Sequence, residues 1–496
     1  MKKGAEMQIN VKRRDVEFKP DSSRVIARFL YTNDERSRTV IKRVLQLSEK
    51  ETKDKLNQVL RKYSRRHRNI SRIFEKHFLQ LGGLFEKIGL NPSDLDITRR
   101  ALIGAYFTME YSIEAAAFFN PSIVESPDQS GILPGEKRVN LSFRATGEGH
   151  ISSIVFRAGI LDRESNLTLE PVGNMLAEAE RIKRFIYNKQ IFLEKLYEMQ
   201  DIHSIVPPEE ILGTLGDTFT YGELETCVRE AIKKYNFPLD KELAFNQIMW
   251  LASSHYEIEF SMDSAICERV IFPISSTERS GIEDARFVKF FDDDGQVIYY
   301  ATYTAYDGMS IMPKLIETKD FYHFKVLPLH GHIAKNKGMA LFPRKIDGKY
   351  AMLCRMDGCN NYISFSDNIN IWNEAFLFQS PHYSWEYIQI GNCGSPIETE
   401  DGWLIITHAV GPMREYVLGA VLMDLEQPKV EIGRLEFPLL APNEREREGY
   451  VPNVVYSCGS MIHNEDLIIP YAVSDYASTY ATVNLKELLS ELKKTK

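Results

Sequence analysis

The stretch EDGWLIITHAV, residues 400–410, places an acidic turn directly before a run of apolar and β-branched residues. An Asp-Gly turn followed by Ile, Leu, Val and aromatic residues is typical of a hairpin that leads into a buried strand. The same pattern occurs at four other places, GEKRVNLSFRA (135–145), DDGQVIYYATYTAY (293–306), IDGKYAMLCRM (346–356) and NEDLIIPYAV (464–473). The stretch therefore belongs to a repeated strand unit.

The spacing of these turns predicts the fold class. The last four recur about 53 to 64 residues apart, and a block of about 80 residues with helical character separates the first from the second. A period of roughly 50 residues with several strands in each unit is the sequence signature of a β-propeller. Five copies predict a mainly β protein with a five-bladed β-propeller. The alternative is a β-sandwich whose turn spacing is coincidental.

Two other parts of the chain have helical periodicity. Apolar residues at three- and four-residue spacing predict helices from about residue 34 to 118, with Ser48 and Glu51 as a capping box. A second helical block runs from about 174 to 256. The predicted parts are therefore an N-terminal helical region (1–115), blade one (116–173), a helical insertion between blades one and two (174–256) and the remaining blades (257–496). We expect the helical regions to shape one end of the site or to form a homo-oligomer contact.

Composition excludes several classes of partner. The net charge of −8 gives no basic field for nucleic acid. The basic run Arg61–Arg68 predicts a solvated helix face, with a phosphate or polyanion contact as the alternative. No stretch approaches the ~18 apolar residues of a membrane span, and the N-terminus has no signal-peptide pattern. We therefore expect a cytoplasmic protein that contacts neither nucleic acid nor a membrane.

The cysteines also indicate a cytoplasmic protein. Six are scattered without a CxxC pair, which indicates reduced thiols rather than a disulfide framework. The Cys and His residues do not form a cluster with zinc-ligand spacing, so we expect no metal site.

Polar residues near the repeat turns are the candidates for chemistry, because propellers bind ligands where loops from several blades meet. They are Glu283, Asp284, Arg286, Lys335, Lys337, Arg355, Asp357, His408, Arg414, Tyr416 and Asp475. Each residue taken alone could instead have a purely structural role, as part of a surface ion pair, as a solvated lysine or as a core histidine. Together, several cations beside one or two carboxylates at equivalent places in successive blades predict an anion pocket next to an acid. A dianionic phosphate suits Arg and Lys side chains.

In these residues the sequence resembles glycoside hydrolase family 130, the mannoside phosphorylases and their hydrolytic relatives. The matching segments are FNPS (119–122), LSFRA (141–145), GIEDAR (281–286), YTAYDG (303–308), the KNK to LFPRK segment (335–345), GSPIETEDGWLIITH (394–408), the pattern at Tyr416–Asp424, VPNVVYSCG (451–459) and SD (474–475). They cover roughly 115–174 and 256–496, so they span every predicted blade. The loops and the long N-terminal region are most similar to the β-1,2-mannoside branch.

The resemblance implies a five-bladed propeller that inverts configuration at mannose, with Asp284 as the acid that delivers its proton through the mannose 3-hydroxyl. The mannose-binding residues are expected to be Asn120, Ser122, Arg144, Asp307 and Asp475. The phosphate-binding residues are expected to be Arg286, Lys335, Asn336, Arg355, His408, Arg414 and Tyr416. No metal or organic cofactor is implied, and inorganic phosphate is the co-substrate. One departure is Gln389, where many family phosphorylases carry Lys; Arg414 is a candidate to replace that charge.

The sequence supports three hypotheses for the function. The leading hypothesis is reversible, inverting phosphorolysis of β-1,2-linked mannooligosaccharides to α-mannose 1-phosphate and a shortened mannoside. An inverting β-mannosidase is the first alternative, and it needs a second carboxylate about 6.5–9.5 Å from the acid, for which Glu398 and Glu386 are candidates. A non-catalytic glycan-binding propeller is the second alternative. The aromatic residues that could stack on sugars are Tyr303, Tyr306, Trp372, Trp385 and Trp403. Their alternative role is to pack in the core of the blades.

Overall fold

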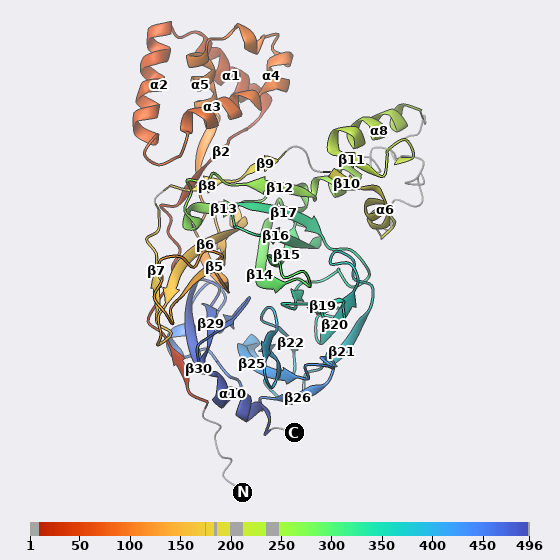
Figure 1. The fold of residues 1–496 in the computed structure, drawn as a ribbon. Coiled ribbons are helices and arrows are strands. Elements are labelled where there is room, and N and C mark those ends of the chain that lie inside the picture. The colour runs from red at the N-terminus through yellow and green to blue at the C-terminus, as the bar shows by residue number, and fades with distance from the viewer. Residues whose placement is uncertain (1–8, 174, 183–185, 199–211, 235–247, 495–496) are drawn as a thin grey trace.

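The computed structural model describes residues 9–173, 175–182, 186–198, 212–234 and 248–494 (Figure 1). Most of this chain forms antiparallel sheets, and the N-terminal helices form a separate layer at one end. The prediction of a mainly β protein is confirmed. Among the helices in these ranges, none is both long and apolar enough to cross a membrane.

Five sheets of four or more strands are present in the described part of the chain. The first has the order β4 (Ala117–Glu125), β5 (Lys137–Thr146), β6 (Ser152–Leu161), β13 (Arg269–Ile271) and β8 (Ala177–Glu178), and β7 (Leu167–Leu169) also pairs with β6. The second has the order β14 (Gly281–Phe291), β15 (Val297–Tyr306), β16 (Ile311–Thr318), β17 (His323–Pro328), β12 (Tyr256–Glu259) and β9 (Glu180–Ile182). The third has the order β18 (Ala340–Leu341), β19 (Tyr350–Cys354), β20 (Asn361–Ser366) and β21 (Ala375–Gln379).

The last two sheets follow the same plan. The fourth has the order β22 (Gln389–Asn392), β24 (Gly402–Val410), β25 (Tyr416–Met423) and β26 (Glu431–Arg434), with β23 (Ile397–Thr399) beside β24. The fifth has the order β27 (Val455–Tyr456), β29 (Asp466–Val473), β30 (Ala477–Asn484) and β1 (Val11–Arg13), with β28 (Met461–His463) beside β29. Each of the five repeated stretches in the sequence lies on the second strand of one sheet, namely β5, β15, β19, β24 and β29. The repeat therefore marks equivalent strands.

The N-terminal helices are α1 (Asp34–Leu45), α2 (Glu49–Tyr63), α3 (Ile70–Leu79), α4 (Gly82–Lys87) and α5 (Ile97–Tyr106). Ser48 and Glu51 form the predicted capping box at the start of α2. The predicted helical limit at residue 118 was wrong, because α5 ends at Tyr106. The chain then forms β3 (Thr108–Ser112), which pairs with β2 (Val25–Phe29), and afterwards enters β4.

The block predicted as a helical insertion contains strands as well as helices. Its described helices include α6 (Lys189–Glu198) and α8 (Tyr221–Lys234), and residues 248–253 are also helical. The strand β10 (Ile186–Asn188) pairs with β11 (Thr218–Thr220). The strands β8 and β9 from the same block, and β12 that begins at its last residue, extend the first and second sheets. Residues 174, 183–185, 199–211 and 235–247 of the predicted block lie outside the described residues. Backbone hydrogen bonding to these sheets therefore joins the block to the β part of the protein.

The basic run is neither a wholly solvated face nor a free anion site. Arg66 and His67 contact Glu110 at 2.7 and 2.8 Å, and Arg68 contacts Asp263 at 2.8 Å. Arg68 also pairs with Glu268. The C-terminal part of the run thus ties the helical layer to β3 and to the segment before β13.

Candidate active site

Two bulged strands meet where the first and second sheets adjoin. The register of β4 shifts between Phe119 and Ser122, and that of β14 shifts between Glu283 and Arg286. Asn120 and Asp284 lie inside these bulges with left-handed φ of 52° and 57°. The Nδ2 of Asn120 donates to Oδ1 of Asp284 at 2.7 Å. Bulges re-aim side chains, and such φ values persist only where surrounding contacts impose them.

Asp284 lies beside a cation and a second carboxylate. Arg144, on β5, places one terminal nitrogen 3.6 Å from Oδ1 of Asp284 and donates from the other to Glu283 at 2.7 Å. Glu283 also pairs with Lys337 at 2.5 Å. The charge of Arg144 is thus shared between two neighbouring carboxylates. The result is a set of donors and acceptors that suits sugar hydroxyls around Asp284.

Asp475 is electrostatically part of this group. Burial and the negative charge of Asp284 raise the pKa of Asp475 to about 6, although the charges of Arg144 and Arg414 oppose both effects. Asp475 and Arg414 have left-handed φ values of 52° and 57° on the loops after β29 and before β25. A carboxyl that titrates near neutral pH can donate or accept a hydrogen bond with a sugar hydroxyl.

A second group centres on the buried ring of His408, on β24. Its Nδ1 lies 3.2 Å from the carbonyl oxygen of Asn392, and its Nε2 lies 3.3 Å from a terminal nitrogen of Arg355. Arginine can only donate, so Nε2 accepts and Nδ1 donates to the carbonyl. Burial holds the pKa of His408 well below its ordinary value, and the charges of Arg355 and Arg286 lower it further. His408 is therefore neutral and orients the guanidinium of Arg355.

Aromatic rings and a glycine fix the position of His408. Its ring is nearly parallel to Tyr416, with centroids 6.2 Å apart, and meets Tyr456 at 61° with centroids 4.9 Å apart. A Cβ on Gly391 would lie 2.3 Å from Cε1 of His408. Residue 391 must therefore be glycine for the ring to lie in this place.

Arg286 connects the two groups, but it does so through protein contacts. One terminal nitrogen donates to the carbonyl oxygen of Asn392 at 3.0 Å and to its side chain, and the other donates to the hydroxyl of Tyr456 at 2.7 Å. Burial lowers the pKa of Arg286, but Tyr456, Cys458 and Asp284 together raise it above its usual value. These contacts hold β14, β22 and β27 together. The phosphate contact expected from the sequence stays a prediction for this residue.

Two expected mannose-binding residues also have structural partners. The hydroxyl of Ser122, which is buried, accepts the backbone N–H of Phe287 at 3.2 Å. The carboxylate of Asp307 accepts the backbone N–H groups of Met309 and Ser310 at 2.8 and 2.7 Å, which closes its own turn. Ser122 links the bulges of β4 and β14. For both residues, contact with a sugar stays a prediction.

The remaining phosphate candidates lie on loops between strands, and the charge of Arg414 acts on Asp475. Asn336 is half-buried and accepts the backbone N–H of Lys337, while Lys335 and Arg414 are exposed. A Cβ on Gly358 would lie 3.9 Å from Nδ2 of Asn336, so the loop of Asn336 faces the loop after Arg355. The structure therefore brings Arg355, His408 and Tyr416 into direct contact and places Asn336 beside the Arg355 loop.

Two contacting residues were not predicted as site residues, namely Asn392 and Tyr456, which bind Arg286. Tyr456 lies in VPNVVYSCG, a segment that carries the family resemblance, so its place in that motif was the available signal. Asn392 follows the atypical Gln389 by three positions and lies outside the matching segments. The candidates Glu283 and Lys337 form an ion pair with each other.

The carboxylates proposed for a hydrolase are engaged elsewhere. Glu398 pairs with Arg344 at 2.7 Å on the surface. Glu386 is buried and accepts the backbone N–H groups of His382 and Tyr383 at 2.7 and 2.9 Å. Neither carboxylate is free to activate water. The rings of Trp372, Trp403 and Tyr303 are buried in the core rather than exposed for sugar stacking.

The comparisons with known proteins agree with the expected family. The family 130 sequence model, described as beta-1,4-mannooligosaccharide phosphorylase, matches residues 246–494. A 1,2-beta-oligomannan phosphorylase from a Thermoanaerobacter species is 36% identical over 240 residues, which are 46% of this chain and 78% of that protein. A beta-1,2-mannobiose phosphorylase from Listeria innocua is 27% identical over 279 residues, which are 53% of this chain and 73% of that protein.

A solved structure of the Listeria innocua beta-1,2-mannobiose phosphorylase with beta-1,2-mannobiose aligns over 77% of this chain and 93% of that chain, with a TM-score of 0.44 and 21% identity. The assignment to a family depends on the sequence matches alone. They cover half of this chain and more than two thirds of the relatives, and they confirm the expected family. The chain belongs to glycoside hydrolase family 130.

Proposed function

We propose that this protein is an inverting phosphorylase of β-1,2-linked mannooligosaccharides, which releases α-mannose 1-phosphate and a shortened mannoside in a reversible reaction. The observation that carries the proposal is the position of Arg286 between the acid and the cations. Its charge interacts with Asp284, and it donates to the carbonyl oxygen of Asn392, which also accepts from His408 of the Arg355–His408 pair. The β-1,2 linkage is supported by the names of three relatives, which are 27% to 36% identical.

The five sheets, we propose, close into a five-bladed propeller with the site at its centre. Each sheet contacts the next, through β4 with β14, β15 with β18, β20 with β22 and β25 with β27, and the fifth contacts the first through β29 and β4. Pairing of β1 with β30 adds the N-terminal strand to the last sheet. This closure supports the predicted division into an N-terminal helical region, blade one, an insertion and four further blades, with β1 assigned to the last blade.

On the mannose side, Asn120, Arg144 and Asp475 would hold the sugar that is transferred. Asp284 would deliver its proton to the leaving oxygen through the mannose 3-hydroxyl, as the family resemblance implies. Asn120 and Arg144 both contact one oxygen of Asp284, so binding of the sugar and placement of the acid use the same side chains. General acid catalysis requires such a group within hydrogen-bond reach of the proton acceptor.

On the phosphate side, Arg355 would supply the main charge, and Tyr416, Asn336, Lys335 and Arg414 would complete the pocket. A phosphate oxygen attacks C1 of mannose while the bond from C1 to the leaving oxygen breaks, which inverts the anomeric centre. Phosphate is its own nucleophile, so no protein base is needed. The fixed charge of Arg355 would offset the negative charge that gathers at the reacting centre.

The contacts of Glu398 and Glu386 favour this reaction over hydrolysis. An inverting hydrolase needs a carboxylate about 6.5–9.5 Å from the acid to activate water. Glu398 is bound by Arg344, and Glu386 is bound by backbone N–H groups of its own turn. The cations around His408 are instead suited to an anionic co-substrate.

Phosphate is the only co-substrate in this proposal, and no metal or organic cofactor takes part. We place the reaction in the cytoplasm, which the six free cysteines support. The helical region, where Leu79 and Ile97 are exposed, is the surface we propose for self-association.

The test is a comparison of β-1,2- and β-1,4-mannobiose in phosphate buffer, with the products separated by chromatography. We expect α-mannose 1-phosphate and mannose from β-1,2-mannobiose, and at least a tenfold lower kcat/KM for the β-1,4 isomer. A tenfold preference corresponds to about 1.4 kcal/mol of transition-state binding. A preference for the β-1,4 isomer would reject the linkage, and turnover of neither isomer would reject the function.

A further inference from the structure

A buried glutamate precedes the first strand in four of the five sheets. Glu114 precedes β4, Glu278 precedes β14, Glu386 precedes β22 and Glu446 precedes β27. Their exposed fractions are 0%, 0%, 2% and 7%. Glutamate is rarely buried so deeply unless it is paired. Three of them lie three positions before the strand, and Glu446 lies nine positions before it, so the sheets repeat one structural device with a longer connection in the fifth.

Each glutamate is paired with a cation from the third or fourth strand of its own sheet. The pairs are Glu114 with Arg157 of β6 at 2.9 Å, Glu278 with Lys314 of β16 at 2.7 Å, Glu386 with Arg434 of β26 at 3.7 Å, and Glu446 with Arg13 of β1 at 3.1 Å. Each carboxylate also accepts at least one backbone N–H, from Asp21, Ile274, His382 or Asn443. Each glutamate therefore holds the segment before the first strand against its own sheet.

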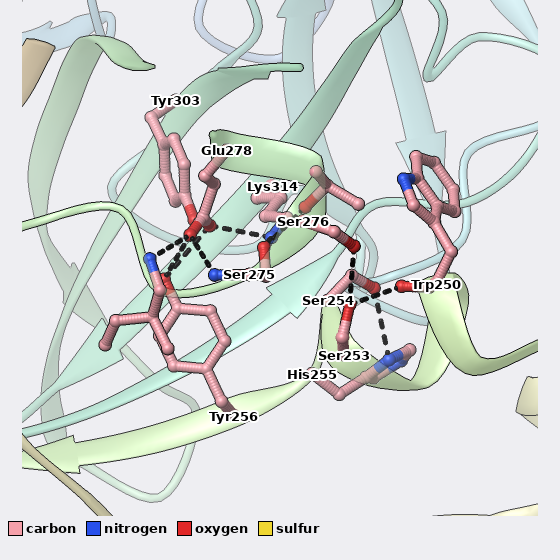
Figure 2. Close-up of polar contacts among 12 residues, drawn as sticks. Trp250, Ser253, Ser254, His255, Tyr256, Ser275, Ser276, Glu278, Tyr303 and Lys314 are labelled. Carbon is pink, nitrogen blue, oxygen red and sulfur yellow. Dashed lines mark hydrogen bonds and ion pairs between the residues drawn. The ribbon is translucent and has the colours of Figure 1, made fainter. Parts of the chain in front are cut away.

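The contacts are most complete at Glu278 (Figure 2). One oxygen accepts the hydroxyl of Tyr303 at 2.6 Å and Nζ of Lys314 at 2.7 Å. The hydroxyl of Tyr256 lies 3.0 and 3.1 Å from the two oxygens. The other oxygen accepts the backbone N–H groups of Ile274 and Ser275, each at 3.1 Å. Donors from β12, β15 and β16 therefore converge on a carboxylate that belongs to the connection before β14.

The same connection is tied to the block inserted between the first two sheets. The hydroxyl of Ser253 lies 3.0 Å from that of Ser276, and Tyr256 follows Ser253 by three positions (Figure 2). A fixed Glu278 therefore positions the connection against both the second sheet and the end of the inserted block.

An unbroken series of contacts leads from Glu278 to Asp284. Arg279 donates to the carbonyl oxygen of Asp307 at 2.6 Å, and the backbone N–H of Ser280 donates to Tyr306 at 3.0 Å. Gly281 has a φ of 141°, and a Cβ there would lie 2.4 Å from Oγ of Ser152. The chain thus has little freedom between the buried carboxylate and the left-handed Asp284. A displacement of Glu278 would be transmitted to the acid.

The spacing repeats at two other sheets. Glu278 and Asp284 are six positions apart, as are Glu114 and Asn120, and Glu386 and Asn392. Asn120 binds the acid, and the carbonyl oxygen of Asn392 accepts from both Arg286 and His408. The residue six positions after the buried glutamate therefore lies on the mannose side in the first two sheets and on the phosphate side in the fourth.

The fourth glutamate reaches the site by a different contact. The carbonyl oxygen of Glu446 accepts the hydroxyl of Ser474 at 2.7 Å, and Ser474 precedes Asp475. The side chain of Glu446 also accepts the hydroxyl of Tyr471 at 2.7 Å from β29, as Glu278 accepts that of Tyr303 from β15. The second strand of each of these sheets thus supplies a tyrosine to the glutamate.

We propose that Glu114, Glu278, Glu386 and Glu446 are positioning residues for the active site, each setting the first strand of its own sheet. This inference rests on the proposed function for its assignment of mannose and phosphate sides. It predicts that glutamates on the mannose side and on the phosphate side affect different kinetic constants. Glu278 acts through the acid and affects kcat, whereas Glu386 acts through Asn392 and affects the KM for phosphate.

The test shortens each side chain by one carbon and keeps its charge, in Glu278→Asp and Glu386→Asp. We expect Glu278→Asp to lower kcat about 30-fold with the KM for phosphate within threefold, because an error of about 1 Å in a catalytic group costs about 100-fold. We expect Glu386→Asp to raise the KM for phosphate about tenfold with a smaller change in kcat. Steady-state kinetics at 20 °C with β-1,2-mannobiose measure both constants.

Glu268→Asp is the matched control. Glu268 is buried, pairs with Arg68 and accepts the backbone N–H of Ala265 at 3.0 Å, but it precedes β13, which is not a first strand. Its substitution should lower thermal stability without separating kcat from KM. If both test variants change kcat and KM by the same factor, or change neither more than Glu268→Asp does, the positioning role is rejected. If Glu278→Asp does not fold, Tyr303→Phe removes one donor and should lower kcat about threefold.

A crystal structure of Glu278→Asp separates this inference from the proposed function. We expect Asp284 to shift relative to Asn120 in that variant, whatever reaction the wild-type protein catalyses. An unmoved Asp284 contradicts the inference even if the wild-type protein is a phosphorylase. A shifted Asp284 in a protein that makes no mannose 1-phosphate contradicts only the proposed function.

Discussion

Substitution of Asp284 by Asn is expected to lower phosphorolysis of β-1,2-mannobiose about 1,000-fold with no loss of folded structure. General acid catalysis contributes roughly 10²- to 10⁴-fold, and Asn cannot deliver the proton. Asn keeps an oxygen that can accept the 2.7 Å hydrogen bond from Asn120, so the bulges of β4 and β14 should persist. The KM for mannobiose should therefore change much less than kcat. The measurement is initial-rate kinetics together with circular dichroism and thermal unfolding.

The control for this prediction is Asp320→Asn in the same sheet. Asp320 accepts backbone N–H groups of Tyr322 and His323 in the turn before β17. This variant should keep full activity and lose a little stability. Asp284→Asn with more than a tenth of wild-type kcat would show that the acid is another residue.

Substitution of Arg355 by Ala is expected to raise the KM for phosphate roughly 100-fold, since a lost charge-assisted hydrogen bond costs about 1.5–3 kcal/mol. The neutral ring of His408 holds one terminal nitrogen of Arg355, and Nε of Arg355 is buried without a partner among the described residues. The guanidinium is thus oriented while donors stay free for an anion. Arg355→Lys should restore part of the affinity, because Lys keeps the charge but not the planar fork.

Arg344→Ala is the matched control for Arg355. Arg344 lies in the neighbouring strand connection and pairs with Glu398 at the surface. Its removal should leave the KM for phosphate unchanged. An equal rise in both variants would indicate a general loss of positive charge rather than a phosphate site at Arg355. An unchanged KM in Arg355→Ala would remove Arg355 from the pocket.

The repeated strands were predictable because their signal is local. An acidic turn followed by alternating apolar residues specifies a hairpin within about a dozen positions, and all five such stretches form the second strand of a sheet. The pairing of β1 with β30 was not predictable, because Val11 and Val483 are joined only after the sheets have assembled. The helical limit failed at Tyr106 because β3 is stabilised by its pairing with β2 rather than by its own periodicity.

For the candidate site, the sequence predicted which residues to compare but not the contacts between them. The motifs brought Asp284, Asn120 and Arg144 to attention, and the structure joins them. Arg286 shows the limit, because a cation in a site motif can equally hold the protein together, and its acceptors lie on strands far along the chain.

The buried glutamates show the same limit. Sequence alone does not distinguish Glu278 from an exposed glutamate, since burial depends on Lys314, Tyr256 and Tyr303 from three other strands. The spacing of six positions between Glu278 and Asp284 becomes informative only when the burial is known.

The most direct test of whether phosphate or water attacks mannose is a proton NMR time course of β-1,2-mannobiose, run with phosphate and again in phosphate-free buffer. The phosphate site that we propose at Arg355 predicts α-mannose 1-phosphate as the first product with phosphate, and no turnover without it. Release of free mannose from the non-reducing end at an equal rate in both buffers would contradict that prediction.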